Sequence, residues 1–360
     1  MARILQLIAS DHRRGAETFA HQLAGELGVL GHDVRVVAIS GDGNGLPVEV
    51  AGRSRSDVRG LRRIVDAARR SDVVVGSGST TLLVGAAAAR AARRPFVYRS
   101  IGDPSIWGQV RLAGLRVGVP ARSAARVVTV FPEATETFRH RYRVPAARLA
   151  TITNGVPAAQ FQPASPREAA AARGRLGLDP GRRWVGLVGA LSPEKDPLLA
   201  LRAVHHLDAD VGLVVAGGGP LADEVRSAAS DLGDRVRLLG VTDDVTGVYA
   251  AIEALVLPSR TEGVPAVAIE AALCGLPVVA TAVGGVPSVV VDGATGRLLH
   301  EPDPAELASA TADALVHRDR WGVAARRHAL DRFTMDVVGR RWDELLREVL
   351  AESRQRRTSA

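Results

Sequence analysis

The sequence predicts an α/β protein built from two doubly wound parallel-sheet domains. Short apolar segments that read as strands alternate with segments of helical period along most of the chain, which is the order of βαβ units. A length of 360 residues suffices for two domains of roughly 150 to 180 residues, each with its own core. A stretch rich in Ala, Pro, Arg and Gly over residues 157–183 separates two runs of this alternation.

These observations predict the domain boundaries. We expect a Rossmann-like N-terminal domain over residues 1–160, a linker over 161–183, and a second Rossmann-like domain over 184–334. A helix over 335–352 is expected to cross back to the first domain. Residues 353–360 are expected to form a short, basic and disordered tail.

The elements follow in regular order. The first domain is predicted to hold strands at 3–9, 34–39, 72–75, 95–99, 126–130 and 149–153, and helices over 16–30, 58–70, 80–93 and 132–142. The second is predicted to hold strands at 184–188, 212–216, 236–239, 255–257 and 277–280, and helices over 198–207, 221–230, 264–273, 303–315 and 318–330. The first loop lacks G-x-G-x-x-G, which counts against a dinucleotide oxidoreductase.

Residues 255–281, LVLPSRTEGVPAVAIEAALCGLPVVAT, are the most informative stretch. They read as strand, loop, helix and strand, so Glu262 lies in a loop at the carboxyl end of a strand, where parallel sheets bind ligands. Glu270 interrupts an otherwise apolar helical run and needs a hydrogen-bonding partner. That partner is either a neighbouring backbone group or arginine, or a ligand.

Composition narrows the location of the protein. Cys274 is the only cysteine, so no intrachain disulfide can form and a reducing, cytoplasmic compartment is expected. The apolar run at residues 4–9 is too short for a signal peptide, and the apolar run at 264–283 is broken by a charge, a glycine and a proline. Peripheral contact with the inner face of a membrane stays open.

Charge is divided unevenly along the chain. Residues 1–180 hold 26 Arg against 14 Asp and Glu, a net charge of +12, whereas residues 181–360 have a net charge of −5. A basic first half favours an anionic acceptor, a phospholipid surface or nucleic acid, unless it only reflects codon bias. Aromatic residues make up only 4% of the chain and do not interleave with the basic ones, which argues against nucleic acid.

The pattern P-S-x-x-E-G-x-P-x-x-x-x-E-A-x-x-x-G-x-P-V-V-A-T resembles the E-x7-E signature of the family 4 retaining glycosyltransferases. That family has the GT-B fold, in which two Rossmann-like domains face a cleft. The resemblance implies that Glu262 reaches the donor sugar and acts as a catalytic residue, while Glu270 accepts from the ribose diol. It also implies donor contacts by the backbone that follows Glu262, namely Gly263, Val264, Pro265 and Ala266.

Lys195 is the only lysine in the chain, at a strand-to-helix turn, where every other cation is Arg. It aligns with the lysine of the family's G-R-L-x-x-x-K-G pattern, which binds the donor diphosphate and serves catalysis. The family's arginine is Ala190 here and its last glycine is Asp196. Arg260 or Arg14 is a hypothetical substitute for that arginine. The alternative is an exposed lysine without a function.

Other donor contacts are implied by glycine-containing turns. Gly15 resembles the glycine loop after the family's first strand, where backbone amides approach the diphosphate; a plain turn is the alternative, and Arg14 replaces one usual glycine. Gly240 and Val241 would contact the nucleotide base through their backbone. Gly284 and Gly285 should lie close to the donor.

The acceptor side is less well marked. Relatives commonly place a histidine near the reacting sugar, but this chain has none between His32 and His140. Residues at the end of a predicted strand, together with one loop cation, are candidates for the acceptor or sugar side: Arg14, Arg99, Ser100 and Asp103. A structural turn role is the alternative for Asp103.

The resemblance implies transfer of a sugar from a nucleotide-diphosphate donor with retention at the anomeric carbon. We expect no metal and no cofactor, because the D-x-D at Asp208 and Asp210 precedes a strand and lies at the wrong edge of the sheet. The acceptor is a small molecule, a glycan or a lipid. A nucleotide-sugar epimerase with this fold and a non-catalytic nucleotide-sugar-binding protein are the alternatives. The sequence does not identify the nucleotide, the sugar or the oligomeric state.

Overall fold

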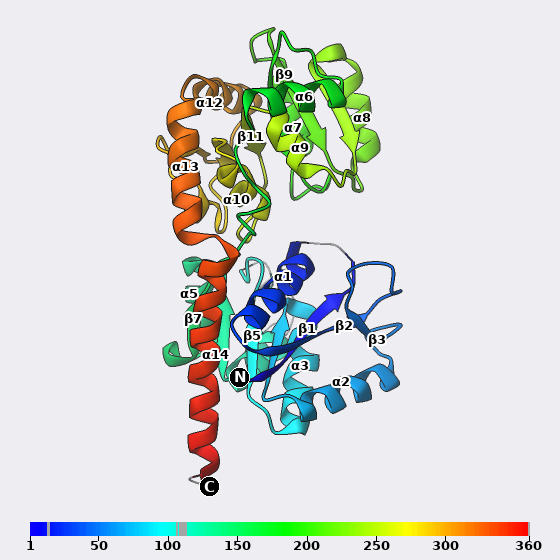
Figure 1. Cartoon of the computed structure of the whole chain (residues 1–360), viewed down its shortest axis with the longest axis vertical. Helices are drawn as coiled ribbons and strands as arrows, with labels where there is room; N and C mark the ends of the chain where they lie inside the picture. The colour runs from blue at the N-terminus through cyan, green and yellow to red at the C-terminus, as the bar shows by residue number, and fades with distance from the viewer. Residues whose placement is uncertain (13–14, 106, 108–113, 359–360) are drawn as a thin grey trace. The chain divides into compact units, whose positions relative to one another are not determined.

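The computed structural model describes residues 1–12, 15–105, 107 and 114–358, and the chain divides into two compact units (Figure 1). Unit 1 comprises Met1–Gly155 with Met335–Ala360, and unit 2 comprises Val156–Thr334. The stretch predicted as a linker contributes a helix to unit 2. That helix, α6 (Pro166–Leu176), begins with a capping box between Ser165 and Glu168 and ends at Gly177 in a left-handed conformation.

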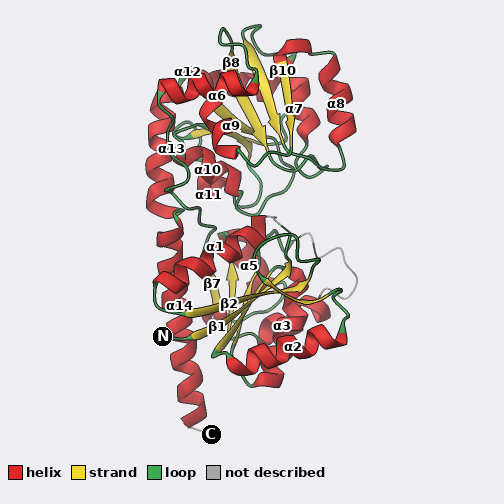
Figure 2. Cartoon of the chain, turned by 45° about the vertical axis from the view of Figure 1, so that its right-hand side comes forward, coloured by secondary structure: helices red, strands yellow, loops and turns green. Residues whose placement is uncertain are grey.

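The described residues of unit 1 form one parallel sheet of seven strands in the order β3-β2-β1-β4-β5-β6-β7 (Figure 2). These strands are β1 (Arg3–Ser10), β2 (Asp33–Ser40), β3 (Glu49–Gly52), β4 (Val73–Ser77), β5 (Phe96–Arg99), β6 (Arg126–Thr129) and β7 (Leu149–Thr151). Their helices are α1 (Gly15–Val29), α2 (Val58–Arg70), α3 (Ser79–Ala92), α4 (Val119–Ser123) and α5 (Pro132–His140), with a π-helical turn at Gly114–Gly118 and a 3₁₀ turn at Ala146–Arg148. Apolar strands covered on both faces are typical of such sheets.

The last helix, α14 (Met335–Thr358), packs in unit 1 against α1. Its buried Trp342 and Leu346 share a core cluster with Phe19 and Leu23 of α1. The same helix is fixed to the loop after α1 because a ring nitrogen of His32 lies 2.7 Å from a carboxylate oxygen of Asp343.

The prediction of a disordered tail over residues 353–360 is wrong for residues 353–358, which continue α14. Glu352 explains the continuation, because it pairs with Arg126 at 2.5 Å and lies 3.8 Å from Arg356 one turn later. Arg and Gln in the last turns also have high helix propensity. Residues 359–360 lie outside the described part of the chain.

Unit 2 contains a second parallel sheet, with six strands among its described residues, in the order β10-β9-β8-β11-β12-β13. These are β8 (Arg183–Val188), β9 (Val211–Ala216), β10 (Val236–Gly240), β11 (Ala254–Leu257), β12 (Val278–Thr281) and β13 (Gly296–Leu299). The helices after α6 are α7 (Pro197–Val204), α8 (Ala222–Ser230), α9 (Val245–Ala251), α10 (Ala266–Leu273), α11 (Val286–Val289), α12 (Pro304–Val316) and α13 (Arg318–Arg332), with a 3₁₀ turn at Gly233–Arg235.

The predicted α/β class and both parallel sheets are confirmed. The sequence pattern misses the edge strands β3 and β13, because each includes a glycine and a charged residue and so lacks the apolar run of the other four-residue strands. No helix in the described part of the chain is both long and apolar enough to cross a membrane.

Candidate functional site

The candidate site of unit 2 lies where the order of strands in its sheet reverses. The chain runs from β8 outward to β9 and β10 on one side, and from β11 outward to β12 and β13 on the other. β8 and β11 are neighbours, so the loops that leave their carboxyl ends lie side by side. Open parallel sheets bind ligands at such a switch point.

Lys195 and Glu262 meet at this point, one from each loop. Nζ of Lys195 donates to Oε1 of Glu262 over 2.6 Å, and Oγ of Ser259 donates to the same oxygen over 2.7 Å. The Glu262 side chain is only 6% exposed, whereas that of Lys195 is 28% exposed. Ser259 therefore helps to orient the buried carboxylate, while part of the Lys195 side chain is exposed to solvent.

Asp196, which replaces the family's glycine, adopts the backbone conformation that glycine favours. Its φ is +42° and its ψ is +56°, in the left-handed region. The carboxylate supports this conformation by accepting from the N–H of Leu199 as the N-cap of α7. It also pairs with Arg260, whose Nη2 lies 2.8 Å away. Arg260 thus holds the neighbouring turn, and its role as a phosphate clamp stays a hypothesis.

Gly284 and Gly285 pack directly against the backbone of the Glu262 loop. A Cβ on Gly284 would lie 1.9 Å from the carbonyl oxygen of Glu262, and one on Gly285 would lie 2.5 Å from that of Gly263. The N–H of Gly285 donates to the carbonyl of Gly263 over 2.6 Å. The two glycines therefore allow the Glu262 loop to pack closely against their backbone, and a side chain at either position would displace that loop.

Glu270 has the partner that its apolar surroundings require. Oη of Tyr249, on α9, donates to Oε2 of Glu270 over 2.7 Å. Burial raises the pKa of Glu270 above its ordinary value, and the hydrogen bond from Tyr249 partly opposes that rise. Among the described residues, no hydrogen bond is found to the other carboxylate oxygen, so it is suited to accept from a diol. Tyr249 carries no local sequence signal that could have identified it.

Gly240 and Val241 lie at the carboxyl end of β10, two strands from β8. Gly240 has a φ of +68°, its carbonyl accepts from the N–H of Gly217, and Val241 is 84% exposed. Asp244 is the N-cap of α9 and accepts from the N–H of Gly247, while Thr242 accepts from the N–H of Asp244.

The remaining residues that are predicted to contact the donor lie just before α10 and at its start. Val264 and Pro265 are buried, and α10 begins at Ala266 with no side-chain cap. Backbone N–H groups in the first turn of an uncapped helix are suited to bind an anion. Gly263 precedes them and is held by Gly285.

In unit 1, Gly15 begins α1, and a Cβ at this position would meet no described residue within 4 Å other than its neighbours along the helix. Arg14 lies outside the described residues. Arg99 is fully buried; it stacks on Phe19 with its guanidinium carbon 3.9 Å from the ring centroid, and it donates to the Asn154 side chain. Burial lowers the pKa of Arg99 to about 9.

The other two candidates of unit 1 have structural partners. Ser100 is buried, and its N–H donates to the carbonyl of Val128. Asp103 accepts from the N–H of Ser105 over 2.8 Å, which is the geometry of a turn. Neither observation tests a contact with an acceptor.

The D-x-D carboxylates are engaged elsewhere, since Asp208 and Asp210 both lie within 4.0 Å of the Arg183 guanidinium. Among the described residues, one group of three side chains could hold a metal ion. These are Asp11, His12 and Asp42, whose possible ligand atoms lie within 4.8 Å of one another. The absence of a metal from the reaction stays a prediction.

The chain matches two family profiles. Residues 13–160 match Glycosyltransferase Family 4, and residues 182–317 match Glycosyl transferases group 1. A GDP-mannose-dependent alpha-(1-6)-phosphatidylinositol monomannoside mannosyltransferase of Mycolicibacterium smegmatis is 31% identical over 306 residues, which cover 79% of this chain and 78% of that protein. A D-inositol 3-phosphate glycosyltransferase of Mycolicibacterium gilvum is 38% identical over 192 residues, covering 51% of this chain but only 42% of the relative.

Solved structures show the same fold. HepE (Alr3699) of Anabaena, solved in complex with UDP and glucose, aligns with a TM-score of 0.85 and 23% identity over 97% of this chain and 100% of its own. Sucrose-phosphate synthase of Thermosynechococcus elongatus aligns with a TM-score of 0.82 and 21% identity, covering 98% and 100%. With two parallel-sheet units, a full-length structural match and a relative similar over most of its length, the chain belongs to family 4 of the glycosyltransferases and has the GT-B fold.

Proposed function

We propose that this protein transfers a sugar from a nucleoside-diphosphate donor to an acceptor hydroxyl, with retention of anomeric configuration and without a metal. The observation that carries the proposal is the pairing of Lys195 with Glu262 at the switch point of the unit 2 sheet. A lone ammonium beside an oriented, buried carboxylate offers one group for a diphosphate and one for a sugar.

Lys195 is proposed to bind the diphosphate. An ammonium has three N–H donors, and Glu262 accepts one of them, which leaves two for phosphate oxygens. Departure of the diphosphate is the hard step of transfer, and a fixed positive charge stabilises the negative charge that develops on it. The uncapped N-terminus of α10 would add N–H groups to the same anion.

Glu262 is proposed to bind the sugar and Glu270 the ribose. Ser259 and Lys195 both donate to Oε1 of Glu262, so Oε2 is available to a sugar hydroxyl. Tyr249 likewise holds one oxygen of Glu270 and leaves the other to a diol. Gly15 is proposed to contact the diphosphate through its backbone, because a Cβ there would meet none of the described side chains within 4 Å.

The donor is testable by thermal shift. UDP-, GDP-, ADP- and dTDP-sugars are added separately, since a ligand that binds only the folded protein raises its melting temperature. UDP-glucose and GDP-mannose are the first two probes, because HepE was solved with the former and the Mycolicibacterium smegmatis relative depends on the latter. If none of the four donor classes raises the melting temperature, the proposal is wrong.

Measurements of turnover distinguish a glycosyltransferase from a nucleotide-sugar epimerase and from a non-catalytic binding protein. Glu262→Gln should abolish transfer while donor still raises the melting temperature, and the exposed Glu224→Gln should behave as the wild type. Donor incubated without acceptor should yield no epimer; an epimer would instead show a nucleotide-sugar epimerase. Donor binding without turnover by the wild type, over a broad acceptor panel, would show a non-catalytic binding protein.

The acceptor is proposed to be anionic. Unit 1 holds 29 Arg against 17 Asp and Glu, a net charge of +12, whereas unit 2 has a net charge of −5. The named relatives act on inositol 3-phosphate and on a phosphatidylinositol mannoside, both of which carry phosphate. Phosphorylated polyols should therefore be better acceptors than the same polyols without phosphate, as measured by release of the nucleoside diphosphate.

A cytoplasmic location is proposed from the sole cysteine. Cys274 is buried in unit 2, and burial raises the pKa of its thiol to about 12. A buried, protonated thiol without a disulfide partner is compatible with a reducing compartment. Fractionation of cells that express the tagged full chain would test the location.

A further inference from the structure

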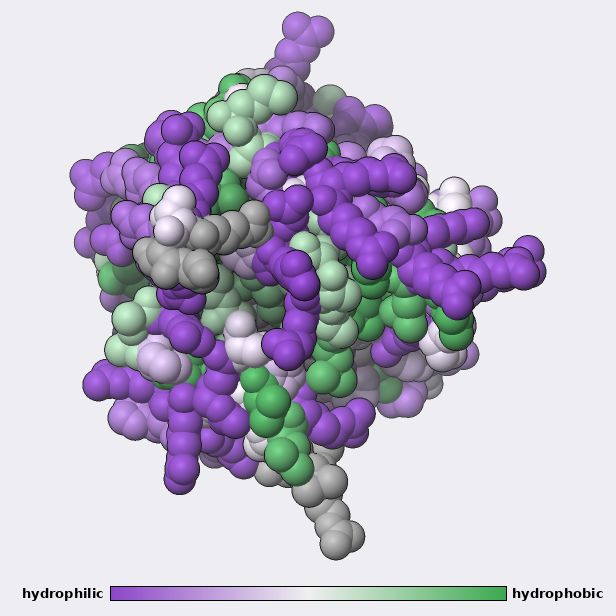
Figure 3. All heavy atoms as spheres, turned by 90° about the horizontal axis from the view of Figure 1, so that it is seen from below, coloured by the Kyte–Doolittle hydropathy of each residue, from purple (hydrophilic) through white to green (hydrophobic). Residues whose placement is uncertain are grey.

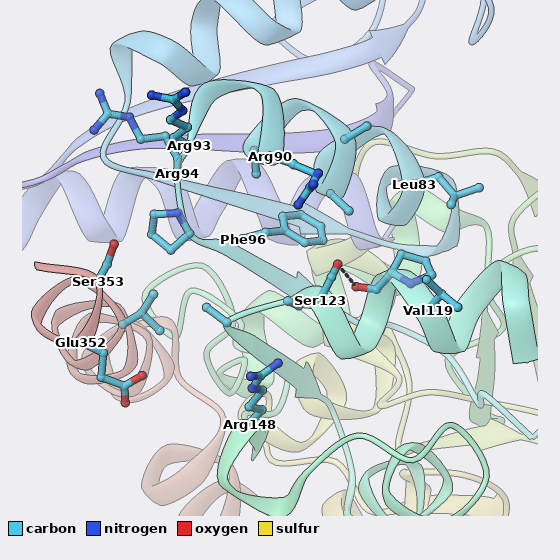
Figure 4. Close-up of a pocket in the computed structure, with 18 of the residues that line it drawn as sticks. Leu83, Arg90, Arg93, Arg94, Phe96, Val119, Ser123, Arg148, Glu352 and Ser353 are labelled. Atoms are coloured by element: carbon cyan, nitrogen blue, oxygen red, sulfur yellow. Dashed lines mark hydrogen bonds between the residues drawn. The ribbon is translucent and has the colours of Figure 1, made fainter. Parts of the chain in front are cut away.

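Unit 1 contains a groove that no predicted donor or acceptor residue lines. Its volume is about 990 Å³, and it lies between the end of α3, the short helix α4 and the last turns of α14 (Figure 4). Phe96 opens β5 and Ala125 precedes β6, and both line the groove. The groove therefore lies at the amino ends of these parallel strands, the edge opposite to the one where ligand sites of such sheets form.

The groove exposes apolar side chains. Leu83 of α3 is 53% exposed, Leu115 is 62% exposed and Val119 of α4 is 48% exposed. Single exposed hydrophobic residues are normal on protein surfaces, but these three line one depression. Figure 3, which views the molecule from below, shows hydrophobic residues exposed between projecting hydrophilic side chains.

Arginines surround the apolar residues. Arg90 comes from the last turn of α3 and Arg94 from the loop that follows it. Arg148 comes from the turn before β7, and Arg356 from the last turn of α14. Nε of Arg94 is buried without a hydrogen-bonding partner, while its Nη2 donates to the carbonyl of Arg69. The groove thus presents several cations around an apolar floor.

The acid in the lining does not cancel these charges. Glu352 accepts from Arg126 at 2.5 and 3.1 Å, and this pair lowers the pKa of Glu352; an oxygen of Glu352 also lies 3.8 Å from Arg356. Arg126 does not line the groove, whose lining holds five arginines against this one acid. The local charge is therefore positive, like that of unit 1 as a whole.

We propose that this groove docks the protein on the surface of an anionic phospholipid bilayer. Arginine side chains attract anionic headgroups, and the apolar side chains between them can enter the headgroup and acyl boundary. Both signals occur here on one surface, and the strength of binding to a membrane interface grows with buried apolar area together with electrostatic attraction to anionic lipids. The proposal concerns a partner of unit 1 and does not depend on the donor chemistry of unit 2.

Vesicle flotation tests the proposal on the full chain. Phosphatidylcholine vesicles are compared with vesicles that also contain phosphatidylglycerol, at low and at physiological salt. The wild type should bind the anionic vesicles, less at higher salt, and should not bind the neutral ones. Each arginine near an anionic surface contributes about fivefold to partitioning, so Arg90→Gln/Arg94→Gln/Arg356→Gln should bind about a hundredfold more weakly.

A matched triple variant controls for net charge. Arg53→Gln/Arg55→Gln/Arg59→Gln removes the same charge from exposed residues beyond the carboxyl end of β3 and at the start of α2, and should retain most of the binding. Leu83→Ser/Leu115→Ser should abolish the part of the binding that survives physiological salt. Apart from Arg94, which is partly buried, the variants replace exposed side chains, and circular dichroism checks that all of them fold.

Three outcomes would overturn the proposal. The wild type fails to bind anionic vesicles, it binds neutral vesicles equally well, or the two arginine triples lose binding to the same extent. The first two exclude an anionic bilayer as the partner, and the third shows that the net charge acts without the groove. Because turnover is not measured, failure here leaves the proposed donor chemistry unaffected.

Discussion

Lys195 and Glu262 are 67 residues apart in sequence, yet the only lysine of the chain donates to a buried carboxylate at 2.6 Å. The two residues lie in the loops that follow the neighbouring strands β8 and β11 at their carboxyl ends. Each therefore affects the other when either is changed, and a substitution at Lys195 should alter both ligand use and stability.

Lys195→Met should weaken donor use by roughly tenfold to a hundredfold, the equivalent of a charged hydrogen bond of about 1.5 to 3 kcal/mol. It should also destabilise unit 2 by about 1 kcal/mol, because Glu262 keeps only Ser259 as a donor. Steady-state kinetics and urea unfolding measure the two effects. Lys195→Arg keeps the charge and should recover part of both losses; an unchanged kcat/KM in Lys195→Met would contradict the assignment.

Glu270→Gln should raise stability at neutral pH while it weakens donor binding. The pKa of Glu270 in the folded protein is raised above the ordinary value of 4.5, so the folded state holds the proton more tightly than the unfolded state. The stability that this proton provides is present below the unfolded pKa and is lost as pH rises through the folded pKa. The gain from Gln should therefore grow as pH increases through that window, as followed by urea unfolding at several pH values.

Asp196→Gly and Asp196→Ala should differ in stability although both remove the same carboxylate. Ala loses the N-cap of α7 and stays in a left-handed conformation, so we expect a loss of about 1 to 2 kcal/mol. Gly loses the same cap but adopts that conformation readily, so we expect a change within about 0.5 kcal/mol. Equal losses in guanidinium unfolding would show that backbone strain at this position is unimportant.

Gly284→Ala should displace the Glu262 loop. Its Cβ would lie 1.9 Å from the carbonyl oxygen of Glu262, and its φ of +52° is unfavourable for alanine. We expect destabilisation of about 2 kcal/mol or more and a loss of turnover. Gly293→Ala serves as the control, because it has a similar φ of +68° but open space around its Cβ, and it should retain turnover.

Gly15→Ala tests the contact with the donor diphosphate. The new Cβ would meet nothing within 4 Å, and alanine in a helix is generally at least as stable as glycine. Thermal stability should therefore be unchanged or slightly higher, whereas donor KM should rise if this backbone approaches the phosphates. A KM identical to that of the wild type would reduce Gly15 to a plain turn.

Much of the fold could be predicted from sequence, because strand and helix periods are local properties. Helix α2 is predicted at its observed bounds, and strand β11 is predicted within one residue. The edge strand β3 has the same four-residue length as β11, but its sequence, EVAG, includes a charge and a glycine and so lacks the apolar run that identifies β11. The end of α14 could not be predicted either, because Glu352 is stabilised by Arg126, 226 residues away.

In the site, too, sequence motifs identify individual residues, whereas the contacts between those residues depend on the tertiary structure. Glu262, Glu270 and Lys195 lie in motifs, so sequence alone identifies them as candidates. Their contacts depend on which strands and helices become neighbours, and no local pattern indicates this for Tyr249 and Glu270. The burial of Arg99 beneath α1 could not be predicted from an exposed-looking strand end for the same reason.

The pair between Asp196 and Arg260 joins the turn before α7 to the turn after β11, and the N–H of Arg260 adds a second tie by donating to the carbonyl of Glu194. Two turns joined by these contacts are expected to move together as one rigid segment. A ligand that pushed either turn aside would carry the other with it, so Lys195 and Glu262 should keep their spacing whether the site is empty or filled.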